Sequence, residues 1–313
     1  EGLPYLDGIE MTIASDDTAR TAAVVTGTVD FIEYAPLRDI DSLQQNPDIA
    51  LAGDSNTNIR FAGLNLAREP FDRLSAMLDR APEQAAIPPM GHLLCFLPGS
   101  AQADIGEDGH PKRGGIVPPI DLPMRMAAGS RVSFHAPVPY GAKVRRVSTI
   151  ANLADKTGRT GRLVFLTLRH EIFADQTLCA TDEADIVFRE RTGNTGPLPP
   201  GERREAQVSR SIAPTAALLF RFSALTYNAH RIHYDRDYAM NEEGYPGLVV
   251  HGPLLATLLV DHFRRHRPTD VVARFEFRAQ RPVFDLAPFT VNLVDTETGA
   301  DVWAADGDGY VAM

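Results

Sequence analysis

The chain has 313 residues, of which 44% are hydrophobic and 23% charged, a composition typical of globular proteins rather than of disordered or fibrous ones. Its 31 basic and 41 acidic residues give a net charge of −10, so we expect no clustered basic face that would bind nucleic acid. No apolar run approaches the ~18 residues of a membrane-spanning helix, so we expect no membrane partner.

Residues 1–72 differ in charge from the rest of the chain. They hold four Arg, no Lys and thirteen Asp or Glu, a net charge of −9, and all nine histidines follow them. Hydrophobic patterning predicts strands at Ile9–Ile13 and Val29–Ile32, and helices at Ala19–Thr26 and Arg38–Gln45. This alternation is typical of α/β proteins, but so short a segment holds only part of a sheet. We therefore predict a partial α/β fragment.

Residues 73–190 are predicted to begin with helices and to continue as strands. The helices are expected at Arg73–Arg80 and Gly91–Leu97. Residues 191–214 are rich in Gly, Pro and charge, which predicts a linker. The strands are predicted at Arg131–Ala136, Lys143–Ala151, Arg162–Phe173 and Thr177–Arg189.

Residues 215–313 repeat this plan, with a strand predicted at Leu218–Ala224 before the helix. Pro253 suits the first turn of a helix that runs to His266, and most of its side chains are apolar, so we expect it to be buried. A buried helix followed by antiparallel strands predicts an α+β fold in which a sheet wraps around the helix. The later strands are predicted at Val271–Arg281, Phe289–Val294 and Asp301–Ala305.

The densest group of polar side chains lies just after residue 224. It contains Asn228, His230, His233 and Asp235. Histidine titrates near neutrality, so a loop histidine beside amide and carboxylate groups is suited to general acid/base catalysis. The same histidines would serve a metal site only with a third ligand, which the local spacing does not provide. A third interpretation is that they merely bind the loop backbone.

A glycine at the expected start of the buried helix is the second candidate. Gly252 follows His251 and precedes Pro253. A backbone N–H at a helix N-terminus is a donor that the helix dipole strengthens, and it would stabilise a developing oxyanion. Glycine is also a common N-cap residue, so the pattern is weak alone.

Together these motifs resemble the MaoC-like hotdog hydratases. The order N-x-H-x-x-H-Y-D followed by HGP is similar to the active-site loop and central-helix start of that family, and further similarity lies in DGHPKRGGIVPP, FHAPVPYGAKVRR, KTGRTGRLVFLTLRHEI and FRAQRPVFD. The resemblance covers residues 73–313 and is strongest to hydratases of mesaconyl-C4-CoA and itaconyl-CoA. It implies a double hotdog fold and reversible addition of water to a dicarboxylic or branched 2-enoyl-CoA, with no metal and no cofactor apart from the coenzyme A of the substrate.

The resemblance also implies roles for single residues. His233 matches the catalytic histidine, Asn228 stands where the family usually has an aspartate, and Gly252 matches the glycine that binds the thioester oxygen. An asparagine orients water but accepts no proton at neutral pH, which leaves proton transfer to His233, with Asp235 as a candidate orienting partner. The residues expected to contact the substrate are His230, Arg231, Asp235, His251, Arg278 and Arg281, with Arg231 near a substrate carboxylate and Arg278 or Arg281 near coenzyme A phosphates.

Residues 1–72 resemble an internal stretch of periplasmic oligopeptide-binding proteins of ABC transporters, through DDTARTAAVVTGTVDFIE and STNIRFAGLNLAREPFD. We expect a fused fragment with no peptide-binding activity, although a peptide-binding protein fragment is one alternative function. The other is a non-catalytic acyl-CoA-binding hotdog protein. The chain has two cysteines, Cys95 and Cys179, which exclude a disulfide framework, so we expect them to be core thiols of a cytoplasmic protein. Separately, we expect the protein to form a homodimer.

Overall fold

The structure is a computed structural model that forms two compact units, Glu1–Ser55 and Asn56–Met313. In the first unit, helix α1 (Asp17–Val25) begins where the Asp16 side chain accepts a hydrogen bond from the Ala19 N–H. The other elements predicted there lie wholly or partly outside the described residues. The structure describes residues 16–30, 32, 39, 42–43, 45–49, 63–112, 116–118, 120–158, 161–190 and 199–313.

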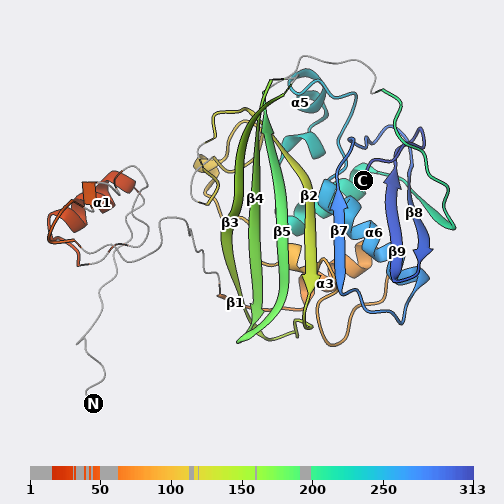
Figure 1. The fold of residues 1–313 in the computed structure, drawn as a ribbon, viewed down its shortest axis with the longest axis horizontal. Coiled ribbons are helices and arrows are strands. Elements are labelled where there is room, and N and C mark those ends of the chain that lie inside the picture. The colour runs from red at the N-terminus through yellow and green to blue at the C-terminus, as the bar shows by residue number, and fades with distance from the viewer. Residues whose placement is uncertain are drawn as a thin grey trace. The chain divides into compact units, whose positions relative to one another are not determined.

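The second unit is built on an antiparallel sheet with the strand order β1-β3-β4-β5-β2-β7 (Figure 1). The four strands predicted before residue 190 are confirmed, and β2 and β3 are longer than expected. The edge strand β7 comes from the second half of the predicted repeat and pairs with β2 from the first half, so the two halves share one sheet. The bounds are β1 (Gly63–Asn65), β2 (Met124–Phe134), β3 (Lys143–Gly158), β4 (Gly161–Ala174), β5 (Thr177–Arg189) and β7 (Arg274–Arg278).

A second antiparallel sheet has the order β6-β8-β9 and lies beside helix α6 (Figure 1). Its strands are β6 (Val208–Ile212), β8 (Phe289–Thr296) and β9 (Gly299–Ala305). Strand β6 lies within residues 191–214, which the sequence predicts to be a linker, so that prediction is wrong for the part of the segment from Val208 to Ile212. The reason is that Val208 and Ile212 turn partly buried side chains inward between exposed ones, and the strand pairs with β8.

The buried helix is confirmed, whereas one predicted strand is a helix. Helix α6 (Gly252–His266) buries every side chain from Leu254 to His262. Residues 216–226, predicted as a strand in part, form helix α4 (Ala216–Thr226), because the Thr215 hydroxyl caps it by accepting from the Leu218 N–H. The part of the second unit that the structure describes also contains α3 (Glu69–Met77), α5 (Arg236–Asn241) and the 3₁₀ turns η2 (Gly91–Leu94), η3 (Gln102–Asp104) and η4 (Arg231–His233).

The boundary between the units differs from the predicted junction at Asp72–Arg73, which lies inside α3. Strand β1 pairs with β3, and Phe71 is 1% exposed in the core of the second unit. The segment from residue 63 to 72 is therefore part of the hotdog-like body.

Both cysteines are free and buried, as expected, and burial raises the pKa of Cys95 to about 12, with Arg146 opposing the rise. Such a thiol is unreactive at neutral pH. Among the described residues, the structure contains no helix with the length and hydropathy of a bilayer span.

Candidate active site

The predicted catalytic loop connects α4 to α5. Helix α4 ends at Thr226, and the left-handed backbone of the next residue, Tyr227 (φ 50°), turns the chain. The Asn228 side-chain oxygen then accepts a hydrogen bond from the His230 N–H at 2.9 Å. The carbonyl end of Asn228 is therefore bound to the loop backbone. The short turn η4 follows and carries His233 into the interior, where it is 7% exposed.

His233 has the protonation state that a general base needs. Its Nδ1 lies 2.7 Å from the Val249 carbonyl oxygen, which only accepts, so Nδ1 carries the proton. Burial lowers the pKa of His233 to about 4, while the bond to Val249 opposes this and the nearby His110 adds to it. At pH 7 the imidazole is neutral, and its Nε2 lone pair is available to accept a proton.

His251 packs against His233 in the interior, and its predicted contact with the substrate stays a prediction. It is fully buried, its ring stacks on that of His233 at 3.7 Å, and its Nε2 lies 2.8 Å from the Ser223 hydroxyl. Burial, with the nearby His233 and His230, lowers the pKa of His251 to about 2, so this ring is also neutral.

Gly252 opens α6 directly after this stacked ring. Gly252 is half-buried, and a Cβ placed on it would make ordinary van der Waals contact with Met313 at 3.9 Å and with Ala127 at 4.0 Å. The helix that follows is 15 residues long, so its dipole favours negative charge at this N–H. This N–H directly follows the ring that stacks on His233, so Gly252 stays a candidate oxyanion donor.

A second loop, residues 106–112, packs on the catalytic loop. The Asp108 carbonyl accepts from the Arg231 N–H at 2.9 Å, and the ring of His110 lies 4.0 Å from that of His230. Gly109 has φ +86°, and a Cβ there would lie 1.8 Å from the Ala229 oxygen, so only glycine allows this approach.

The sequence analysis does not identify Asp108 and His110 as functional residues, although both lie in the motif DGHPKRGGIVPP. Asp108 Oδ2 is 3.2 Å from His110 Nδ1. Burial raises the pKa of Asp108, but the hydrogen bonds from His110 and the nearby imidazoles outweigh it and lower the pKa to about 2. The pair borders a hollow of about 160 Å³, lined by Gly106, Asp108, His110, Pro111, Lys112 and Arg125.

This second loop also supplies what the sequence spacing lacked for a metal site. One possible ligand atom from each of Asp108, His110 and His230 lies within 4.8 Å of the others, in the part of the chain that the structure describes. Two imidazoles and a carboxylate are a donor set that zinc accepts.

Arg231 and Asp235 bind each other, at 2.8 Å between Arg231 Nη2 and Asp235 Oδ2. Arg231 also donates to the Glu107 carbonyl, and Asp235 caps α5 by accepting from the Tyr238 N–H. The expectation that Asp235 orients His233 is wrong, because Val249 fills that role.

The two arginines expected near coenzyme A have different surroundings. Arg281 is 11% exposed and pairs internally with Asp306 at 2.9 Å, so its position does not favour contact with a phosphate. Arg278 is exposed at the end of β7, opposite Gly129.

Comparisons with known proteins identify the family of the chain. Residues 90–285 match the family of hydroxyacyl-thioester dehydratase type 2. The chain is 47% identical to the mesaconyl-C(4)-CoA hydratase of Chloroflexus aurantiacus over 230 residues, which are 72% of this chain and 81% of the relative. Residues 1–76 match the middle region of bacterial extracellular solute-binding proteins of family 5, as the resemblance of the N-terminal segment predicted.

Solved structures support the fold. HtdX of Mycobacterium tuberculosis aligns with a TM-score of 0.59 at 16% identity, covering 80% of this chain and 96% of its own. A MaoC-like dehydratase of Phytophthora capsici aligns with a TM-score of 0.61 at 13% identity, covering 82% of this chain and 93% of its own. The predicted double hotdog and the predicted hydro-lyase class are confirmed. The chain belongs to the hydroxyacyl-thioester dehydratase type 2 family.

Proposed function

We propose that this protein reversibly adds water to the double bond of a dicarboxylic or branched 2-enoyl-CoA, of the mesaconyl-C4-CoA or itaconyl-CoA type. The observation that carries the proposal is the neutral His233, with its proton fixed on Nδ1 by Val249, together with the N-terminus of α6 at Gly252, which directly follows the ring that stacks on His233. A base and an oxyanion donor side by side are what this addition requires.

In the forward direction, His233 Nε2 accepts a proton from water as the water oxygen bonds to the β-carbon. The electrons of the double bond move toward the thioester oxygen, where the Gly252 N–H stabilises the negative charge. Such a donor typically contributes about 3–4 kcal/mol. A proton delivered to the α-carbon completes the addition.

The substrate class draws support from the relative named a mesaconyl-C(4)-CoA hydratase and from the charge around the hollow. Lys112 and Arg125 line it, and cations there complement a free carboxylate on the acyl group. Arg231, first expected in this role, is occupied by Asp235. The test is turnover of mesaconyl-C4-CoA and itaconyl-CoA against crotonyl-CoA, which lacks the second carboxylate. Coenzyme A binding without turnover of any of them would favour the non-catalytic alternative.

We further propose that the reaction needs no cofactor, that the protein is a cytoplasmic homodimer, and that residues 1–72 come from a fusion. Dialysis against EDTA should leave turnover unchanged, because His233 and the Gly252 N–H supply base and oxyanion donor without a metal. Loss of activity that Zn²⁺ restores would contradict this and would point to Asp108, His110 and His230 as ligands. Light scattering tests the dimer.

A further inference from the structure

We propose that His110, held by Asp108, is a second catalytic residue, which donates the proton to the α-carbon while His233 takes the proton of water. This inference rests on the proposed function and deepens it by assigning the second proton-transfer step. Three features of the described residues support it: no other residue of the site is assigned as the acid, Asp108 and His110 form a carboxylate–imidazole pair, and a hollow borders that pair.

The unfilled role is that of the acid. Hydration moves two protons, one off water and one onto carbon, and His233 is already committed to the first. Asn228 carries no transferable proton at neutral pH, and its oxygen is bound to the His230 N–H. His251 is fully buried against the His233 ring, so it is poorly placed to donate a proton to a substrate.

The Asp108–His110 pair fits this role. The Asp108 carboxylate lies 3.2 Å from His110 Nδ1 and accepts its hydrogen bond, which orients the ring and leaves Nε2 on the side away from Asp108. His110 keeps 22% of its side chain exposed and lines the hollow of about 160 Å³, so a ligand there touches it. Its ring reaches the catalytic loop through His230, whose ring centroid is 4.0 Å from His110 and 5.2 Å from His233.

The loop that carries the pair is fixed to the catalytic loop by backbone contacts. The Arg231 N–H donates to the Asp108 carbonyl, and Gly109 lies so close to Ala229 that a side chain would not fit. Such contacts hold His110 at a constant separation from the catalytic loop, as two groups that act on one substrate require.

The step balances as follows. The water oxygen forms the C–O bond at the β-carbon, its proton moves to His233 Nε2, and the π electrons move onto the thioester oxygen beside Gly252. These electrons return to form the C–H bond at the α-carbon with the proton from His110 Nε2. His233 then loses its proton to solvent and His110 regains one, so one water is added and no oxidant or reductant is needed.

The test uses the full chain with mesaconyl-C4-CoA. We expect His110→Ala to lower kcat by about 10²–10⁴-fold with a small change in KM. Added imidazole should restore turnover, whereas pyrazole, which has the same size but is a far weaker base, should not. Asp108→Asn keeps an acceptor for the His110 N–H but loses the charge, and it should lower kcat less than His110→Ala.

The chain offers a matched control. His266 and Asp295 form a second histidine–carboxylate pair, also at 3.2 Å, far along the chain at the end of α6. His266→Ala should leave kcat unchanged. If His110→Ala has the same kcat for mesaconyl-C4-CoA as wild type and His266→Ala, His110 is not the acid, and the proposed function stands. Rescue by imidazole and pyrazole alike would also overturn it, since it would show a space-filling role. If wild type shows no turnover, the proposed function itself fails.

Discussion

Single residues divide the chemistry of this site between a base and its supports. His233→Ala should abolish turnover and leave coenzyme A binding nearly intact, because the side chain is the proposed base and, at 7% exposed, offers little surface for binding. Turnover and binding by calorimetry measure the two effects separately. Wild-type turnover by this variant would contradict the mechanism and favour a structural role for the loop.

Asn228 tests whether an orienting amide is enough. Asn228→Ala should cost less than His233→Ala, because it removes a hydrogen bond to the His230 N–H and no base. Asn228→Asp keeps that acceptor and restores the acid that the resemblance leads one to expect, so it should retain the loop structure. Kinetics of both variants, each with its melting temperature, distinguish loss of the loop from loss of chemistry.

The buried histidines should make the protein less stable in acid. The pKa values of His233 and His251 fall to about 4 and about 2, below the value near 6.5 of an unfolded histidine. Below pH 6.5 the unfolded chain therefore binds protons that the folded chain does not, and each histidine costs up to about 1.4 kcal/mol per pH unit. Denaturant unfolding between pH 7 and 4.5 should show this fall, and a smaller one in His233→Gln. Equal slopes would contradict it.

The sequence alone predicts His233, Asn228 and Gly252 as site residues, because they lie within one loop and at the start of a later helix. It did not reveal His110, since the contact between His110 and His230 joins residues 120 positions apart. It also assigned substrate contacts to His251, whose burial depends on the tertiary stacking with His233.

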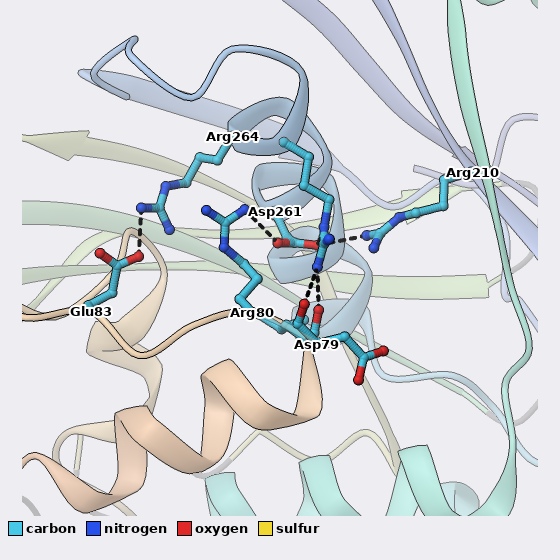
Figure 2. Close-up of polar contacts among 8 residues, drawn as sticks. Asp79, Arg80, Glu83, Arg210, Asp261 and Arg264 are labelled. Carbon is cyan, nitrogen blue, oxygen red and sulfur yellow. Dashed lines mark hydrogen bonds and ion pairs between the residues drawn. The ribbon is translucent and has the colours of Figure 1, made fainter.

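At the level of elements, a buried carboxylate joins three segments. Figure 2 shows Asp261 of α6 facing Arg80, which follows α3, and Arg210 of β6, while Arg265 of α6 binds it from the same helix. The Asp261 side chain is 2% exposed.

Asp261→Asn should lower the free energy of unfolding by about 3 kcal/mol, because it leaves three partly buried guanidinium groups without a countercharge. Asp270→Asn is the matched control: it breaks the exposed pair with Arg267 near the same helix end and should cost less than about 1 kcal/mol. Urea unfolding measures both, and equal effects would mean that the Asp261 cluster does not join the segments.

Element prediction failed where local and tertiary signals conflict. The run Leu218–Ala224 is apolar enough for a strand, but Thr215 caps it as a helix and Phe222 is buried. Strand β6 has a weak pattern of its own and depends on pairing with β8. The helix at Gly252–His266 was predictable because its apolar run, proline and basic end all agree.

For the whole molecule, the two units predict two different outcomes of truncation. Deleting residues 1–55 removes one compact unit and should leave the melting temperature and the hydratase activity of the other largely unchanged. Deleting residues 1–72 also removes β1 and Phe71, which belong to the second unit. Phe71 is 1% exposed, and losing such a side chain alone costs about 3–5 kcal/mol.

Thermal unfolding of both truncations, with turnover measured in parallel, tests this difference. The expected result is a folded, active 56–313 chain and an unstable 73–313 chain, because Leu66 and Phe71 pack into the same core as the helix α6 that carries Gly252. Phe71→Ala in the full chain is a milder version of the longer cut and should lower the melting temperature in the same direction. Equal stability of the two truncated chains would show that the segment from residue 63 to 72 contributes nothing to the hotdog body, whatever its sequence origin.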